Sequence, residues 1–225
     1  MIRILLADDQ RLVRTGFRLI LESEPDLTVV AEAADGQQAI ELARTTRPDV
    51  VLMDVRMPVL DGIAATAGLT GQPGGPRVLV LTTFDLDEHV YDALAAGASG
   101  FLLKDVKADQ LVDAIRTVHA GDALLAPTVT RRLIGRLVAA RPPRSGSTTR
   151  SELAARLTER EQEVLVLIAR GLSNAEIARA LVVSGATVKT HVGHVFAKLG
   201  VHARSQAVIA AYESGLVQPA EFDRT

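Results

Sequence analysis

Three aspartates, a threonine and a lysine stand where apolar segments of the N-terminal half end. Asp8 and Asp9 follow the first of these segments, Asp54 ends the third, Thr82 the fourth and Lys104 the fifth. Crowded carboxylates repel one another and need a cation, and an all-oxygen site with room for water suits Mg²⁺. A carboxylate beside such a metal is a competent nucleophile toward a phosphoryl donor. The pattern therefore predicts a Mg²⁺-dependent site that accepts a phosphoryl group.

Each side chain has a chemical role in such a site. Asp54 is the candidate nucleophile and would form an acyl phosphate. Lys104 can neutralise charge on the phosphoryl group, and the Thr82 hydroxyl can donate a hydrogen bond to it. Taken singly, such residues are more often helix caps, strand residues or solvated surface charges. Their placement at successive segment ends favours the site.

The segments that position these residues are short, rich in Val, Ile and Leu, and separated by helix-length amphipathic stretches. This alternation predicts a doubly wound α/β domain, in which helices cover both faces of a five-stranded parallel sheet. Ligands of such sheets bind outside the carboxyl ends of the strands, where all five residues would converge. The predicted strands are IRILLAD (2–8), TVVAEA (28–33), VVLMDV (50–55), RVLVLTT (77–83) and GFLLK (100–104).

The C-terminal part has helical patterns only. Residues 158–161 and 173–176 each match the S/T-x-x-E capping box, and Gly171 lies where a first helix would end. Helices are expected near 158–170, 174–182, 185–199 and 203–214. Residues 127–139 can extend one more helix, and 140–151, rich in Pro, Gly, Ser and Thr, are predicted to form a flexible linker. We expect domains at 1–122 (α/β) and 153–218 (all-α), joined by 123–152.

The composition and charge of the chain exclude several classes of site and of protein. The chain has no cysteine, which excludes disulfides and thiolate metal sites. No apolar run is long enough for a signal peptide or a membrane span, so we expect a soluble, cytoplasmic protein with no membrane partner. Residues 1–125 hold 11 lysines and arginines against 19 acids, whereas no acid lies between Glu176 and Glu213. This acid-free stretch is suited to a phosphate-bearing partner.

The expected helix 185–199 carries polar residues at its start and apolar residues on its other side. A helix of this kind can present its first turns to base edges in a DNA major groove, while caps and helix N-termini hold phosphates. Ser184, Thr187 and His191 fit phosphate contacts. The further DNA-binding candidates of this acid-poor region are Ser173, Asn174, Lys189, Thr190, Lys198 and Arg204.

The N-terminal motifs resemble a known family. LLADDQ, LMDVRMPVLDG, VLTTFD and GASGFLLKD, in this order, are similar to the receiver domain of bacterial two-component response regulators, which has a flavodoxin-like fold. The resemblance implies that Asp54 accepts a phosphoryl group from a phosphohistidine on a sensor histidine kinase. It also implies that Asp9, Asp54 and the backbone carbonyl of Arg56 bind Mg²⁺, with Asp8 assisting through water. Thr82 and Phe101 would then be the switch pair. Asp105 follows Lys104 where many receivers have proline, so a cis peptide bond is not expected there.

The C-terminal motifs resemble a second family. LTEREQEVL, SNAEIA and TVKTHV are similar to the LuxR-type helix-turn-helix at the end of NarL/FixJ regulators. The resemblance implies that Lys189 and Thr190 reach bases. Gly193, one turn later, can make no side-chain contact, whereas some relatives have basic residues there. The last helix has Val208, Ile209, Ala211 and Tyr212 near one face; they can pair with a second copy on DNA or simply pack in the core.

The leading hypothesis is a phosphorylation-dependent DNA-binding transcription regulator without an enzyme's catalytic residues, the receiver acting at most on its own phosphoryl group. One alternative is a phosphatase with Asp54 as covalent nucleophile, although Arg56 stands where such an enzyme needs its second acid. The other is a constitutive DNA-binding protein with a vestigial receiver.

Overall fold

The structure, a computed structural model, describes residues 1–71, 74–82, 86–120 and 150–217. It divides the chain into two compact units, Met1–Leu124 and Leu125–Thr225. The predicted helix extension and linker at 123–152 lie almost wholly outside the described residues. Among the residues described, no helix is long and apolar enough to cross a membrane.

The first unit is built on a five-stranded parallel sheet with the strand order β2-β1-β3-β4-β5. This order is that of flavodoxin-like folds and confirms the predicted doubly wound architecture. Each strand except β2 leads directly to one of the candidate site residues. The strands are β1 (Ile2–Ala7), β2 (Leu27–Ala33), β3 (Val50–Asp54), β4 (Arg77–Thr82) and β5 (Gly100–Leu103).

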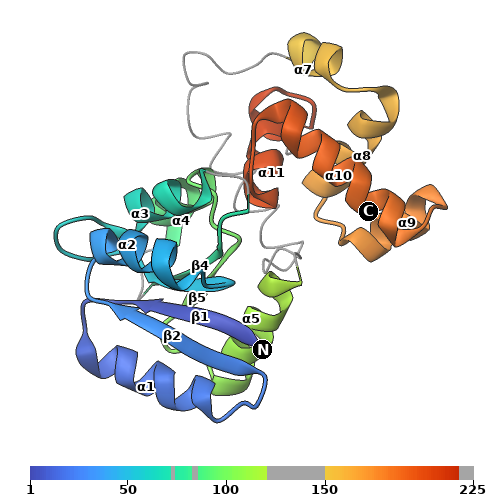
Figure 1. Cartoon of the computed structure of the whole chain (residues 1–225). Helices are drawn as coiled ribbons and strands as arrows, with labels where there is room; N and C mark the ends of the chain where they lie inside the picture. Colours follow the sequence, from blue (N-terminus) through green and yellow to red (C-terminus); the bar gives the residue numbers. More distant parts are fainter. Residues whose placement is uncertain (72–73, 83–85, 121–149, 218–225) are drawn as a thin grey trace. The chain divides into compact units, whose positions relative to one another are not determined.

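Helices cover both faces of this sheet (Figure 1). On one face lie α2 (Gly36–Thr46), α3 (Gly62–Thr70) and α4 (Leu86–Ala95), and on the other α1 (Arg11–Glu22) and α5 (Ala108–His119). Right-handed crossovers between parallel strands impose this two-sided arrangement.

The core follows from the alternation of side chains along each strand. On the side of α1 and α5, Leu6, Leu52 and Leu81 are at most 1% exposed and belong to one cluster with Leu21 and Ile115. Burying a side chain of this size contributes about 1.5–3 kcal/mol. The strands are therefore held rigidly, and so are the residues at their ends.

The second unit is all-helical, as predicted. Its helices are α7 (Arg150–Arg156), α8 (Glu159–Ala169), α9 (Asn174–Leu181), α10 (Gly185–Leu199) and α11 (Arg204–Glu213). Both predicted capping boxes are present, and Gly171 follows α8 with a positive φ of 80°. The start of α7 falls inside the stretch predicted to be linker. Its Leu153 is 1% exposed, and this burial stabilises helical structure that the polar composition does not suggest.

Candidate functional site

The structure brings the three acids of the first unit together. Strands β1 and β3 pair with Ala7 opposite Met53, so the residues that follow, Asp8 and Asp54, lie at the same level of the sheet. One carboxylate oxygen each from Asp8, Asp9 and Asp54 can be chosen so that all lie within 4.8 Å of one another. Asp8 and Asp54 are buried, whereas Asp9 is exposed. The cluster thus has a closed inner side and an open outer side.

Lys104 is the inner counter-charge of this cluster. Its Nζ lies 2.7 Å from Oδ2 of Asp8 and 3.0 Å from Oδ2 of Asp54. All three side chains are at most 10% exposed, so these ion pairs are poorly screened by water. The ammonium group of Lys104, which directly follows β5, therefore offsets part of the repulsion for which the sequence predicted a cation.

Burial and pairing act in opposite directions on these two charges. Burial raises the pKa of Asp54 above its ordinary value, and the hydrogen bond and charge of Lys104 offset this effect in part. Burial also opposes the charge on Lys104, but the two carboxylates outweigh it and raise the pKa of that ammonium. Lys104 therefore stays protonated at neutral pH, next to the candidate nucleophile.

The remaining predicted residues lie around this cluster. Thr82 ends β4 with 8% of its surface exposed, and its carbonyl oxygen accepts the Lys104 backbone N–H at 2.9 Å. Phe101 is half-buried on β5, opposite Val80. Arg56 is exposed, and its backbone N–H donates to the Asp54 carboxylate. All described peptide bonds are trans, including the bond between Lys104 and Asp105.

The cluster fits the predicted metal. Its candidate ligand atoms are carboxylate oxygens, the donors that Mg²⁺ prefers, and the exposed side of Asp9 leaves room for the water ligands that Mg²⁺ retains. The described acids therefore form a cluster that could bind a metal ion.

The loop from β3 to α3 depends on two glycines to which the sequence interpretation gave no role. A Cβ on Gly62 would lie 1.8 Å from the carbonyl oxygen of Asp54, and one on Gly36 would lie 2.5 Å from that of Leu60. The Gly62 N–H also donates to Val55 O at 3.0 Å. Because Gly62 has no side chain, the backbone at the start of α3 can lie directly against the backbone of Asp54. The Asp-Gly pair at 61–62 is a turn signal that could have identified this position.

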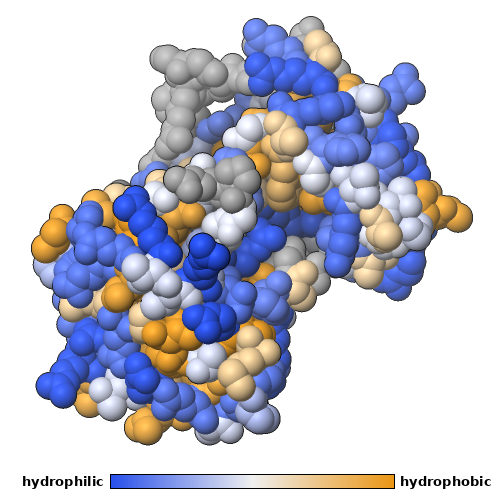
Figure 2. Space-filling view, viewed as in Figure 1, coloured by the Kyte–Doolittle hydropathy of each residue, from blue (hydrophilic) through white to orange (hydrophobic). Residues whose placement is uncertain are grey.

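In the second unit, α9 and α10 form a helix-turn-helix whose turn contains Val182 in the left-handed region at φ 53°. Hydrophilic residues cover most of the face of this unit seen in Figure 2. Val188 and Val195 of α10 are buried on the inner side, whereas Lys189 and Thr190 are exposed near its start. The first turns of α10 therefore present polar groups to solvent, the arrangement that major-groove recognition requires.

The N-termini of α8, α9 and α10 are capped by side chains of the same unit. Oγ of Ser184 accepts the Thr187 N–H at 3.1 Å, and Oγ of Ser173 accepts the Glu176 N–H at 3.3 Å. Ser184 and Thr187 are exposed, while Ser173 is half-buried. His191 is half-buried too, and its Nδ1 has no hydrogen-bond partner within the described part of the chain.

Two predicted DNA-binding residues make contacts inside the unit. Lys198 Nζ donates to Oε2 of Glu161 at 2.6 Å, which joins α10 to α8. Arg204 donates to Oδ1 of Asn174 at 3.1 Å and to the carbonyl oxygen of Leu172. It thus ties α11 to the start of α9. Sequence patterns within one helix cannot reveal these pairings, because their partners lie 30 or more residues away.

Comparison with known proteins finds a family match for each of the two units. A family model of the response regulator receiver domain matches residues 4–116, and that of bacterial regulatory proteins of the luxR family matches residues 155–211. The chain is 43% identical over 217 residues to an uncharacterized transcriptional regulatory protein, YxjL, of Bacillus subtilis strain 168, covering 96% of this chain and 98% of the relative. The chain belongs to the LuxR-family response regulators.

Further relatives have the same architecture along their whole length. The transcriptional regulatory protein LiaR of Bacillus subtilis strain 168 is 41% identical, with 96% of this chain and all of the relative covered. The crystal structure of the response regulator ChrA, from a heme-sensing two-component system, is 42% identical with a TM-score of 0.51, covering 96% of this chain and 98% of that one. The predicted family is confirmed. A response regulator of this kind is a DNA-binding transcription regulator of a two-component system and not a classical enzyme.

In this response regulator, the apolar residues of α11 are buried within a single chain. Val208, Ile209, Ala211 and Tyr212 are all 6% exposed or less, and α11 contacts α8 in the same unit. Of the two interpretations left open by the sequence, core packing thus explains these residues without a second copy.

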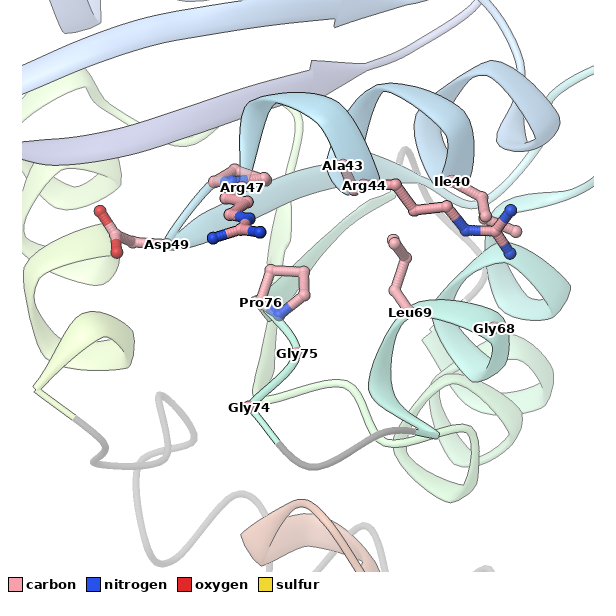
Figure 3. Close-up of a pocket in the computed structure, with 11 residues that line it drawn as sticks. Ile40, Ala43, Arg44, Arg47, Asp49, Gly68, Leu69, Gly74, Gly75 and Pro76 are labelled. Carbon is pink, nitrogen blue, oxygen red and sulfur yellow. The ribbon is translucent and has the colours of Figure 1, made fainter.

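A groove of about 550 Å³ lies at the end of the receiver sheet where strands β3 and β4 begin (Figure 3). It is lined by residues of α2 and α3 together with Asp49 and Pro76, which precede β3 and β4. The acid cluster lies at the opposite, carboxyl ends of these strands. The groove is therefore separate from the acid cluster.

Glu161 is expected to make the stability of the DNA-binding unit depend on pH. It is 4% exposed, and hydrogen bonds from Lys198 and the Thr158 N–H lower its pKa from 4.5 to about 2. A depressed carboxyl pKa means stability that is complete above about pH 4.5 and is lost as the pH falls toward about 2. Glu161→Gln should abolish this dependence and destabilise α8 by about 1–3 kcal/mol. Hydrogen exchange of α8 peptides measures both effects.

Glu163→Gln on the same helix is the matched control. Its carboxylate is 56% exposed and pairs with Arg160 at the surface, so its loss should change stability by less than about 1 kcal/mol. Equal effects of the two substitutions would contradict the role of the Glu161–Lys198 pair.

Gly193 can be used to test whether the exposed face of α10 contacts DNA. It is exposed, and a Cβ there would meet nothing within 4 Å. Gly193→Ala should stabilise the helix by about 0.5–1 kcal/mol. Gly193→Arg should in addition tighten DNA binding and steepen its salt dependence by about one unit of slope, because a new cation faces the phosphates. If the two variants showed the same salt slope, Gly193 would not face DNA.

Proposed function

We propose that Asp54 accepts a phosphoryl group from a phosphohistidine of a sensor histidine kinase. The observation that supports this most directly is the meeting of Asp8, Asp9 and Asp54 within 4.8 Å beside the buried ammonium of Lys104. Asp9, Asp54 and the carbonyl oxygen of Arg56 would hold Mg²⁺, and Asp8 would contact it through water. Bound there, Mg²⁺ would neutralise charge between the carboxylates and the incoming phosphoryl group.

The transfer requires one bond to form and one to break. A carboxylate oxygen of Asp54 attacks phosphorus, the P–N bond of the phosphohistidine breaks, and the released imidazole keeps the electron pair and takes up a proton. Lys104 then exchanges its contact with Asp54 for one with a phosphoryl oxygen. Since Lys104 also pairs with Asp8, it can shift between these partners without losing a counter-charge.

Thr82 and Phe101 form the proposed switch. The Thr82 hydroxyl turns to donate a hydrogen bond to the new phosphoryl group, and the ring of Phe101 moves inward behind it. Their half-buried to buried positions on the adjacent strands β4 and β5 support this coupling. The phosphorylated receiver would thereby favour one of two states and control the DNA-binding unit.

The proposed partner of the second unit is double-stranded operator DNA. Lys189 and Thr190 would contact bases, and Ser184, Thr187 and His191 would contact phosphates, as these residues line the first turns of α10. The same interface would include Ser173, Asn174, Lys198 and Arg204. The internal bonds of Lys198 and Arg204 give them a second task, the fixing of α9 and α10 relative to α8 and α11.

We infer that the regulator binds DNA as a homodimer and works in the cytoplasm. Operators of helix-turn-helix proteins are commonly two half-sites, which a two-fold pair of chains matches. Bacterial DNA and the kinase's phosphohistidine both lie in the cytoplasm.

The decisive experiment is incubation of the full chain with acetyl phosphate and Mg²⁺, followed by intact mass measurement and peptide mapping. A single stable phosphoryl adduct on Asp54 is the expected result. Donor consumption without an adduct would favour the phosphatase, and no reaction would favour a constitutive DNA-binding protein. Either result would overturn the proposal.

Lys189→Ala tests the DNA contacts. We expect a loss of about 1–3 kcal/mol in discrimination between a selected operator and random DNA, because Lys189 reads a base. A uniform loss on all sequences would instead make it a phosphate contact. Lys107→Ala, which removes an exposed lysine of the receiver, is the control and should leave binding unchanged. Binding titrations on both DNAs at several salt concentrations provide the measurement.

A further inference from the structure

A charged network behind the acid cluster connects α1 to β2. Nε of Arg14 lies 3.0 Å from Oε2 of Glu32, and Nε of Arg18 lies 2.7 Å from Oε1 of the same carboxylate. Arg18 also contacts Glu22 at 2.9 Å. Burial disfavours the charge on Glu32, but hydrogen bonds from Arg18 and Arg14 outweigh this and lower its pKa. Glu32 is therefore ionised and shared by two arginines.

Only one of these two arginines reaches the acid cluster. The Arg14 guanidinium also donates through Nη1 to the backbone carbonyl of Asp8 at 2.6 Å, and its side chain is only 14% exposed. Within the described residues, Arg18 contacts only the carboxylates of Glu32 and Glu22, and its side chain is 35% exposed. The two arginines thus share a partner and differ in the contact with Asp8.

The bond to Asp8 is one of four that hold this residue. Its N–H donates to Ala33 O at 3.1 Å, its Oδ1 accepts the Gln10 N–H at 2.9 Å, and its Oδ2 pairs with Lys104 at 2.7 Å. The carbonyl that Arg14 holds belongs to the peptide unit joining Asp8 to Asp9. Fixing the plane of that peptide unit also fixes the direction in which the Asp9 side chain leaves the backbone.

The charge balance of the network also matters for a divalent ion. A guanidinium this close to a cation site would repel the ion if it were unpaired. Glu32 and Glu22 offset the two arginines, so Arg14 can position the loop without adding net positive charge. Groups behind metal ligands commonly change metal affinity 10- to 100-fold when they are removed.

We propose that Arg14, held by Glu32, is a positioning residue that orients the Asp8–Asp9 peptide and thereby sets the Mg²⁺ affinity of the receiver. This rests on the proposed metal site. Arg14 acts through the acids and does not itself touch the ion or the phosphoryl group. Its loss should therefore weaken metal binding while leaving the transfer step intact once the metal is bound.

The test compares Arg14→Gln with Arg18→Gln in the full chain. Calorimetric titration with Mg²⁺ should show a dissociation constant raised about tenfold or more for Arg14→Gln. Arg18→Gln breaks the same carboxylate pairing and spares the Asp8 carbonyl, so its dissociation constant should stay within about twofold of the wild type. Labelling by acetyl phosphate at saturating Mg²⁺ should be equal in all three proteins.

Arg14→Lys keeps the charge and one contact but cannot bridge both partners with a planar fork, so an intermediate Mg²⁺ affinity is expected. It also serves as the second variant if Arg14→Gln does not fold. Equal Mg²⁺ affinities of the Arg14 variants and the wild type would overturn the inference, as would equal losses in Arg14→Gln and Arg18→Gln. A wild type that binds no Mg²⁺ would overturn the proposed metal site as well, which distinguishes the two failures.

Discussion

Replacing Asp54 by asparagine is expected to abolish the response of DNA binding to a phosphodonor while leaving the receiver folded. Asparagine has nearly the same shape, and Lys104 keeps its contact with Asp8 at 2.7 Å, so the buried ammonium is not left unpaired. An amide, however, cannot form the acyl phosphate. The wild type should bind its operator more tightly after treatment with acetyl phosphate and Mg²⁺, by a factor of about 5–150. The variant should show a ratio of about one.

The measurement is a pair of operator titrations for each protein, with and without the phosphodonor. Asp113→Asn is the matched control, because its carboxylate on α5 is 80% exposed and is not one of the three acids of the cluster. It should respond as the wild type does. If the phosphodonor increased the operator affinity of Asp54→Asn as much as that of the wild type, Asp54 would not be the group through which phosphorylation controls DNA binding.

Gly62→Ala is expected to destabilise the receiver strongly. The new Cβ would lie 1.8 Å from the carbonyl oxygen of Asp54, which is backbone and cannot move aside as a flexible side chain can. Either the start of α3 or the end of β3 must shift. Overpacking of this kind typically destabilises a protein by about 1–3 kcal/mol or more. Phosphorylation should fall as well, because the displaced backbone carries Asp54, the proposed phosphoryl acceptor.

The same substitution at Gly16 provides the control. A Cβ there would meet nothing within 4 Å in the exposed middle of α1, so Gly16→Ala should stabilise the receiver by about 0.5–1 kcal/mol. Hydrogen exchange of the β3 and α3 peptides in each full-length variant, together with acetyl phosphate labelling, measures both effects. Normal labelling and protection in Gly62→Ala would show that the loop tolerates displacement.

The sequence alone determined the architecture. Apolar runs ending at Asp8, Asp54, Thr82 and Lys104 were enough to predict a parallel sheet with these residues at one edge, because strands of one direction all end on the same side. Four of the helices described in the second unit, α8 to α11, were equally predictable, whereas α7 was not predicted. Their capping boxes and the glycine after α8 are local signals, in which partners lie within four residues of each other.

Only the tertiary structure decided which charges pair. The sequence predicted that Lys104 neutralises charge on a phosphoryl group, and in the structure its ammonium bridges Asp8 and Asp54. Lys198 and Arg204 were assigned to DNA, and they bond to Glu161 and to the start of α9. Arg14 had no role at all, although it holds the peptide before Asp9. The contacts of Lys104, Lys198 and Arg204 join elements that are distant along the chain, whereas the Arg14 bond to Asp8 spans only six residues. Strand register and helix packing set the distances in all of these contacts. Local spacing carries no information about either, so the sequence specified which groups were available and the fold selected their partners.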